Sequence, residues 1–298
     1  MFRFFRKALA ALASLPLMAS CSVAQVPAAP SPRPALWKLA DADTTIYLFG
    51  SIHVLPDDYK WRTPVFDAAL AKADSLVLEI VVDDPKADDA ATMQKLALSP
   101  GLPPLLDRVA PADRKALAAL IAESKIPTAT LDAMETWAAA LSLASNMVAS
   151  LKMSPDNGVE RQLTSSFRGA GKPIAGLETT AQQLGFFDTL PEKVQREFLK
   201  SVIESGKDAD AEFAKMIKAW SSGDTKGIAA TFDDEMKDSP ELNEILLKRR
   251  NANWAAWLKT RLETPGTIMV AVGAGHLVGD SSVQALLARD GLKVTRVQ

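Results

Sequence analysis

The chain has 298 residues, and its 34 lysines and arginines nearly balance its 36 aspartates and glutamates, which gives a formal net charge of −2 at pH 7. Because it has no basic stripe with interleaved aromatic residues, we expect no nucleic acid partner. The single cysteine excludes a disulfide within the chain. The length suits one well-buried α/β domain, and no segment repeats with the fixed period of a solenoid.

Residues 1–21 are predicted to be an export signal. Basic residues precede an apolar run over residues 8–19, which is too short to span a bilayer. The run ends in Leu17-Met18-Ala19-Ser20-Cys21, which resembles a bacterial lipobox, so we expect a lipid on Cys21 that anchors the protein to a membrane. Ordinary signal-peptidase cleavage near Ser22-Val23-Ala24 is the alternative. The expected location is the bacterial cell envelope, as a lipid-anchored membrane lipoprotein that faces the periplasm or as a soluble periplasmic protein.

Residues 22–35 are expected to be a tether. They are rich in proline and alanine, which favours an extended polyproline-type spacer between the membrane and the following domain. Residues 36–298 are then the α/β domain.

The only two histidines of the chain each close a Gly-x-x-His tetrapeptide behind a strand-like run. The first motif is Gly50-Ser51-Ile52-His53, and the second is Gly273-Ala274-Gly275-His276. An apolar run that ends in glycine is typical of the carboxyl end of a parallel strand, and ligands of open α/β sheets bind outside those ends. We therefore expect the two imidazoles to meet. The alternative is that each histidine only hydrogen-bonds a neighbouring loop.

Two glutamates occupy comparable positions. Glu79 interrupts the strand-like run from Ser75 to Val82, where an unpaired buried charge would be costly. Glu178 lies just beyond a short strand that ends at Gly176. The structural alternatives are an edge or solvated position for Glu79, and for Glu178 only the start of a helix from Ala181.

The remaining pattern predicts the fold class. Helices are expected over most of residues 86–168 and from Ala181 to about Leu262, with late strands over residues 267–272 and 292–297. The sheet must therefore gather strands from both ends of the chain. We expect an α/β fold, with a mixed, largely parallel sheet, flanking helices, and a helical cap insertion over about residues 86–171 that closes over the strand ends.

Together these motifs resemble the TraB/PrgY/GumN family, from about Leu36 to the C-terminus. The resemblance is carried by Gly50-Ser51-Ile52-His53, Leu78-Glu79, Gly176-Leu177-Glu178-Thr179 and Gly273-Ala274-Gly275-His276-Leu277. An Arg-Asn pair on a late helix is a further family feature and matches Arg250-Asn251. The family often has Gly-x-Asp where this chain has Gly158-Val159-Glu160, which keeps the charge on a longer arm and leaves the role of Glu160 open.

The resemblance implies a site shared with the animal members called Tiki, which are membrane-tethered, metal-dependent proteases that act on Wnt proteins. A divalent ion held by His53, His276 and Glu79 would keep an open position, as catalytic sites do. Manganese, cobalt, zinc or iron would suit such ligands. Glu79 and Glu178 would share the roles of ligand and general base.

The same resemblance suggests a role for the late helix. Arg250 would stabilise a developing oxyanion or hold a substrate carboxylate, with Asn251 as an orienting hydrogen-bond partner. A solvated helix surface is the alternative for Arg250. Ser51 has no Ser-His-Asp spacing around it and is interpreted as a small residue near the site.

Two functional hypotheses follow. The first is a metal-dependent hydrolase of the cell envelope, in the first place a peptidase, with a peptide or protein substrate. The second is a non-catalytic metal- or peptide-binding envelope lipoprotein that uses the same residues.

Overall fold

The computed structural model describes residues 31–81, 89–151, 153–206, 209–236 and 239–298. Cys21, the expected export signal and most of the expected tether lie outside the described residues. Residues Pro32 to Gln298 form one unit. Among the helices that are described, none is both long and apolar enough to cross a membrane.

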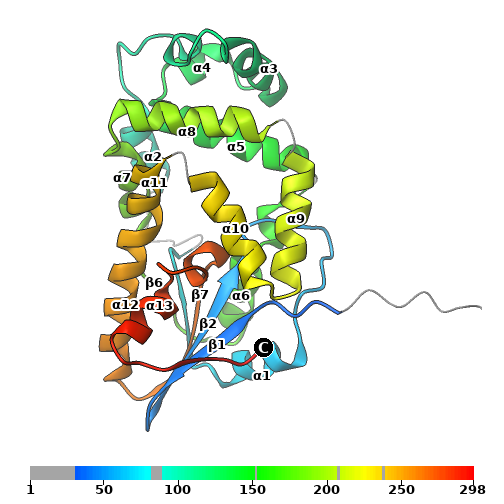
Figure 1. Cartoon of the computed structure of the whole chain (residues 1–298), viewed down its shortest axis with the longest axis vertical. Helices are drawn as coiled ribbons and strands as arrows, with labels where there is room; N and C mark the ends of the chain where they lie inside the picture. Colours follow the sequence, from blue (N-terminus) through cyan, green and yellow to red (C-terminus); the bar gives the residue numbers. More distant parts are fainter. Residues whose placement is uncertain (1–30, 82–88, 152, 207–208, 237–238) are drawn as a thin grey trace, which may run out of the picture. The chain divides into compact units, whose positions relative to one another are not determined.

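A six-stranded sheet organises the domain, in the order β6-β4-β7-β2-β1-β8 (Figure 1). Its strands are β1 (Leu36–Ala40), β2 (Thr44–Ser51), β4 (Ser75–Leu78), β6 (Ile174–Gly176), β7 (Gly266–Gly273) and β8 (Val294–Arg296). The four strands β6, β4, β7 and β2 are parallel, whereas β1 is antiparallel to both of its neighbours. The prediction of a mixed, largely parallel sheet is confirmed, and β1 is a strand that the sequence pattern did not indicate.

Side chains alternate between the two faces of the sheet, because successive residues of a strand point to opposite sides. Tyr47 and Phe49 lie in the core on one face, and Ile46 and Leu48 lie in the core on the other. The first core is closed by α1 (Pro64–Lys72), α6 (Val159–Gly169), α9 (Ala209–Ser221) and α10 (Thr225–Met236). The second is closed by α12 (Arg249–Leu262) and α13 (Val283–Arg289).

A helical cap has a core of its own, and in Figure 1 its helices lie beyond the carboxyl ends of β2 and β7. The cap consists of α2 (Asp89–Ala97), α3 (Arg114–Ser124), α4 (Thr128–Asp132), α5 (Thr136–Ser150), α7 (Thr180–Asp188) and α8 (Glu192–Ser205). Helices α5 and α8 pack on each other, and α2 packs on α7.

The cap differs from the expected insertion over residues 86–171. Helix α6 lies within that range but packs on the sheet and not in the cap. Its residues Val159, Leu163 and Phe167 form an apolar stripe that is buried in the first core. Helices α7 and α8 lie after that range and belong to the cap. The cap is therefore made of two chain segments on either side of α6 and β6.

Shorter elements complete the description. They are β3 (Leu55–Pro56), which pairs with β5 (Met153–Ser154), the helical turns η1 (Leu105–Arg108), η2 (Pro155–Asn157) and η4 (Ala274–Leu277), the helix α11 (Pro240–Asn243) and the π-helix η3 (Glu244–Lys248). The last part of the helical region that was expected to end near Leu262 is thus a series of α11, η3 and α12.

Candidate functional site

The two Gly-x-x-His motifs lie side by side, because β2 and β7 are parallel neighbours in the sheet. Gly50 pairs with Val272, and Ser51 pairs with Gly273. Both strands end at the same edge, and each is followed by its histidine. The structure therefore places both imidazoles of the chain at one end of two adjacent strands.

His53 is the exposed histidine of the site, with 67% of its side-chain surface accessible, against 12% for Glu160. Its Nδ1 lies 2.7 Å from Glu160 Oε1, and Ser51 Oγ donates to the same oxygen at 2.5 Å. The Glu160 carboxylate raises the pKa of His53 to about 9. Burial acts to raise the pKa of Glu160, but the charge and hydrogen bond of His53 outweigh it and the pKa is lowered.

His276 is buried and is held by an amide. Its Nδ1 lies 2.6 Å from Asn251 Oδ1, and Asn251 Nδ2 donates to the carbonyl of Ser281 at 2.8 Å. The second bond fixes the direction of the amide, so His276 carries its hydrogen on Nδ1 and a lone pair on Nε2. Burial lowers the pKa of His276 to about 4, and the nearby Arg250 charge acts in the same direction. The ring is therefore neutral at pH 7.

Glu79 follows β4 directly and is buried, with 8% of its surface exposed. Its Oε1 accepts from the Gly273 N–H at 2.7 Å, and its Oε2 accepts from Arg250 Nη2 at 2.5 Å. Burial opposes its ionisation, but His276, Arg250 and His53 outweigh this effect and lower the pKa of Glu79 to about 2. The edge or solvated alternative is wrong, because β4 is an interior strand and its glutamate is paired.

Arg250 connects the two predicted carboxylates. Its Nε donates to Glu178 Oε1 at 3.0 Å, and its Nη2 donates to Glu178 Oε2 at 2.9 Å as well as to Glu79. Its Nη1 lies 3.1 Å from the Leu246 carbonyl and 3.2 Å from His276 Nε2. Burial disfavours the charge, but Glu178 and Glu79 outweigh it and raise the pKa of Arg250.

This arrangement changes the interpretation of Arg250. The alternative of a solvated helix surface is wrong, because Arg250 is 8% exposed and its guanidinium lies over the rings of Trp254 and Phe186, 4.7 and 5.7 Å from their centroids. Stabilising an oxyanion requires an N–H that is free, whereas all five N–H groups of this guanidinium point at acceptors of the protein. Asn251 orients His276 rather than Arg250.

Glu178 is held from three sides. Besides Arg250, it accepts from Trp254 Nε1 at 3.0 Å and from Gln183 Nε2 at 3.2 Å. The neighbouring Thr179 is the N-cap of α7 and forms a capping box with Gln182. Helix α7 thus begins at Thr180, behind its N-cap Thr179, and the side chain of Glu178 is directed at Arg250.

Potential ligand atoms converge beside Gly273. A Cβ on this glycine would lie 3.2 Å from Glu79 Oε1, 3.6 Å from His276 Cδ2 and 3.9 Å from His53 Nε2. Two imidazoles and a carboxylate are ligands that zinc takes in catalytic sites, and each imidazole here has the second hydrogen bond that metal-binding histidines usually make. By donor chemistry, these residues fit a divalent cation.

Arg250 already bonds one of the atoms that such an ion would need. Its Nη1 is bonded to His276 Nε2, the atom that would ligate, and Glu79 Oε1 lies 3.8 Å from that same nitrogen. As it stands, no group of three or more His, Cys, Asp or Glu side chains in the described part of the chain is arranged to hold a metal ion. A cation at His276 would have to replace the hydrogen bond from Arg250.

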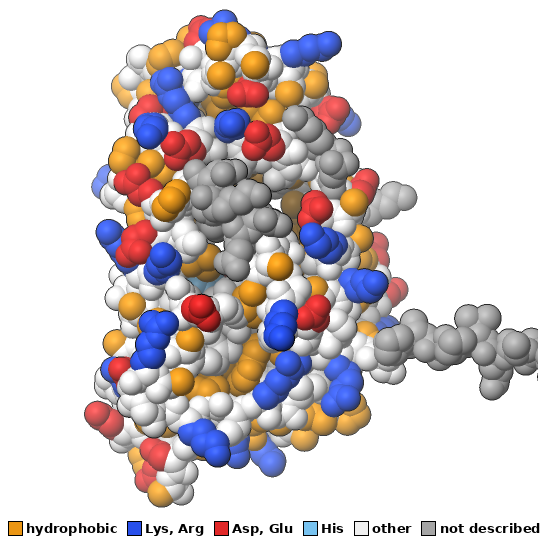
Figure 2. All heavy atoms as spheres, in the orientation of Figure 1, with side chains coloured by type: hydrophobic (Ala, Val, Ile, Leu, Met, Phe, Trp, Pro, Cys, Tyr) orange, Lys and Arg blue, Asp and Glu red, His pale blue; other side chains and the backbone are white. Residues whose placement is uncertain are grey.

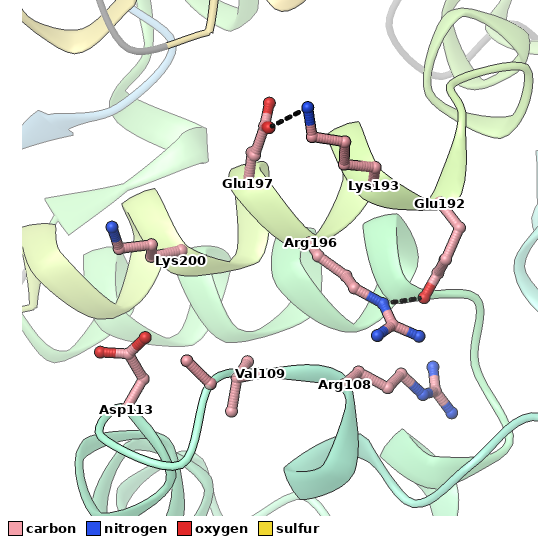
Figure 3. Close-up of a pocket in the computed structure, with 9 residues that line it drawn as sticks. Arg108, Val109, Asp113, Glu192, Lys193, Arg196, Glu197 and Lys200 are labelled. Atoms are coloured by element: carbon pink, nitrogen blue, oxygen red, sulfur yellow. Dashed lines mark hydrogen bonds and ion pairs between the residues drawn. The ribbon is translucent and has the colours of Figure 1, made fainter.

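A separate pocket of about 580 Å³ lies in the cap, between η1 and α8 (Figure 3). Four of its charged residues form two ion pairs: Arg196 Nε lies 2.7 Å from Glu192 Oε1, and Lys193 Nζ lies 3.7 Å from Glu197 Oε1. Over the cap helices, Figure 2 likewise shows acidic and basic side chains interspersed. None of the predicted site residues lines this pocket, and the chemistry of the two motifs lies elsewhere.

Sequence reasoning did not identify two of the residues that hold the site together. Gln183 donates to Glu79 Oε2 at 3.0 Å and to Glu178, so α7 joins the cap to the site. Trp254 of α12 packs in the second core, and it also donates to Glu178. No local pattern distinguishes these roles, because each depends on a partner that is distant in sequence.

Fold and site together define a class: an α/β protein with a helical cap, in which two Gly-x-x-His motifs end neighbouring parallel strands. The model of the TraB/PrgY/gumN family matches residues 35–296, and the chain belongs to this family. It is 24% identical over 241 residues to the "Uncharacterized protein YbaP" of Escherichia coli (strain K12) and of Shigella flexneri, over 81% of this chain and 87% of each relative. No solved structure gives a significant match.

Proposed function

We propose that this protein is a metal-dependent hydrolase of the cell envelope that cleaves peptide or protein substrates. The observation that carries the proposal is the convergence of both imidazoles of the chain with the buried carboxylate of Glu79 beside Gly273. A chain with two histidines that brings both to one carboxylate has the donors of a catalytic metal site.

The protein residues would divide the work as follows. His53 Nε2, His276 Nε2 and Glu79 Oε1 would hold the divalent cation, with manganese, cobalt and zinc as the candidates. Since the pKa of His53 is raised to about 9, its ring would release the Nε2 proton as the cation binds. The bound cation would supply Lewis-acid activation of water or of a substrate carbonyl. His276 is already neutral, and its Nδ1 hydrogen is committed to Asn251, so its Nε2 lone pair faces the site.

Glu178 and Arg250 form the frame of the site in this proposal. Glu178 accepts from Arg250, Trp254 and Gln183, which leaves it poorly placed to take a proton from water. Arg250 neutralises Glu79 and Glu178 where the ion is absent, and the ion would take over part of this role at Glu79. Sequence reasoning left the roles of ligand and general base open between Glu79 and Glu178. With Glu178 held in this way, the role of general base would fall to Glu79, since the raised pKa of His53 keeps that ring protonated near neutral pH.

The choice of a peptide substrate and of the envelope rests on the family and on the expected lipobox. Both are analogies from sequence, since a fold can host unrelated reactions. Cys21 would carry the lipid, and the protein would face the periplasm or be soluble within it. Because Glu178 already accepts hydrogen bonds from three protein side chains, it also favours a second candidate function, a metal- or peptide-binding protein without turnover.

The proposal is tested by metal content and peptide cleavage. The mature chain, purified without chelator, is compared with His53→Ala and His276→Ala, and with Arg249→Ala as a control at an exposed neighbour of the site helix. We expect close to one metal ion per chain in the parent and control, and loss of both metal and cleavage in the histidine variants.

Other outcomes separate the candidates. Metal bound without cleavage of any peptide in a broad library would support the binding protein. Metal retained in His53→Ala with cleavage lost would show that His53 is needed for cleavage but not for the metal, and would reduce the ligands to His276 and Glu79. A parent that takes up no manganese, cobalt or zinc would contradict the metal-dependent mechanism.

A further inference from the structure

We propose that Glu160 is a positioning residue that locks the His53 ring with its Nε2 directed into the site. The inference rests on the proposed function to the extent that His53 takes part in it. Among the described residues, the Glu160 carboxylate is the one side chain that hydrogen-bonds the His53 ring. Since His53 is 67% exposed, packing alone does not fix the orientation of its imidazole.

The backbone around Glu160 is clamped to the first motif. Val159 N donates to the carbonyl of Ile52 at 3.0 Å, so the first turn of α6 is bonded to the residue before His53. A Cβ on Gly158 would lie 2.0 Å from the carbonyl oxygen of His53, so only glycine allows this approach. The glycine and the glutamate therefore act together: one brings the helix close, and the other reaches the ring.

The Glu160 carboxylate hydrogen-bonds two side chains of the first motif. Glu160 is 9% exposed, and its Oε1 accepts both the His53 Nδ1 hydrogen and the Ser51 hydroxyl. No described group donates to its buried Oε2. Turning the imidazole by half a rotation would replace the Nδ1 hydrogen with a carbon-bound one and leave the buried charge with Ser51 as its remaining side-chain donor.

The length of the arm matters in this chain. The helix cannot move closer, because Gly158 already touches the His53 carbonyl and Val159 is bonded to Ile52. Aspartate at position 160 would therefore end one methylene short of His53 Nδ1. Glutamine keeps the length and an acceptor oxygen but loses the charge. The two substitutions separate reach from charge.

The two histidines consequently differ in the acceptor that their Nδ1 atoms face. Asn251 gives His276 a neutral acceptor, whereas Glu160 gives His53 a charged one. A carboxylate on the far nitrogen makes an imidazole a more basic ligand and holds its ring direction. Loss of such an outer partner typically lowers metal affinity or activity by about 10- to 100-fold.

Nuclear magnetic resonance of the ¹⁵N-labelled protein tests the proposal, since the chain has two imidazoles to assign. In the parent we expect a slowly exchanging, strongly downfield Nδ1 proton on His53. Glu160→Asp should lose it, and Glu160→Gln should keep a weaker, less downfield one. Glu123→Gln, at an exposed glutamate of α3, is the control. The ring signals of His276 should stay unchanged in all of them.

Metal affinity and kcat supply the second readout. We expect about a 10- to 100-fold loss in Glu160→Asp and a smaller loss in Glu160→Gln. A parent in which His53 shows no protected Nδ1 proton would overturn the proposal without any variant having to fold. So would a Glu160→Asp protein that keeps the parent signal and affinity. If the signal behaves as expected while no metal binds and no peptide is cleaved, the positioning role stands and the proposed function fails.

Discussion

In the described part of the chain two arginines are buried, and they are held in opposite ways. Arg108, in the cap, is 1% exposed and donates to the backbone carbonyls of Pro103, Asp132 and Met134, at 2.8, 2.5 and 2.6 Å. Arg250, at the site, is bonded to two carboxylates. Burial lowers the pKa of Arg108, whereas the carboxylates raise that of Arg250.

The difference shows what each cation does. Arg108 joins three backbone segments through neutral acceptors, so it fixes the path of the chain in the cap and offers no chemistry. Arg250 holds two charges in place beside a neutral imidazole, so it fixes the electrostatics of a site. Buried charge alone is therefore a weak sign of function, and the ionic partners of the buried group are the better one.

The largest effect is expected from Arg250→Met. It leaves Glu79 and Glu178 buried without a countercharge, which costs about 3–5 kcal/mol of stability. Urea unfolding measures the loss, with Arg249→Met, 67% exposed at its side chain, as the matched control. Equal stabilities of the two variants would contradict the conclusion that Arg250 balances the buried charges of Glu79 and Glu178.

Arg108→Met is expected to lower the free energy of unfolding by less, about 2 kcal/mol. It leaves neutral carbonyls without a hydrogen-bond donor, rather than leaving charges unpaired. The exposed Arg114, which pairs with Asp107, is the control on the same side of the cap. Metal content and cleavage should match the parent. A site lost in Arg108→Met while the protein stays folded would show that the cap arginine is not merely structural.

A double-mutant cycle sharpens the comparison further. Glu178→Gln alone removes one carboxylate partner from Arg250, and in the Arg250→Met background it removes an unpaired buried charge. We therefore expect a coupling energy of about 1–3 kcal/mol between the two positions. Additive losses within experimental error would mean that the pair is not energetically coupled.

The smallest effects are expected from pH. The pKa of His276 falls from 6.5 to about 4 on folding, so the unfolded chain binds the extra proton and stability decreases as the pH drops from 6.5 to 4. The pKa of His53 rises to about 9, so its contribution is complete below pH 6.5 and is lost as the pH approaches 9. Stability should therefore be greatest near pH 6.5.

Histidine variants separate the two limbs of that pH profile. His276→Asn should flatten the acid limb and leave the alkaline one, and His53→Asn should do the reverse. Thermal melting between pH 4 and pH 9 in one mixed buffer gives both profiles. Identical profiles in the parent and both variants would refute the assignment.

The site residues could be predicted where the neighbouring residues in the sequence indicate their position. Glycine-terminated strands placed His53 and His276 at one sheet edge, and the apolar flanks of Glu79 indicated a paired carboxylate. Patterns failed where a partner is distant in sequence. Arg108 reads as one more surface arginine, because the carbonyls that hold it come from residues 103, 132 and 134.

The fold shows the same division. Apolar runs predicted the four parallel strands, and three of them, β2, β4 and β7, are buried on both faces. The cap boundaries were misplaced, because the apolar stripe of α6 does not say whether that helix covers the sheet or the cap. The charge-preserving change at Glu160 left its role open, and only the clamp of Gly158 against His53 shows why the longer arm fits.

A titration of the metal-free, ¹⁵N-labelled protein with zinc, followed at both imidazoles, tests most directly whether one cation is held by both motifs. We expect the Nε2 signals of His53 and His276 to shift together and to saturate at one equivalent, while Asn251 keeps its bond to His276 Nδ1. Signals that do not respond to zinc, or a shift confined to the exposed His53, would contradict a single cation held by both Gly-x-x-His motifs.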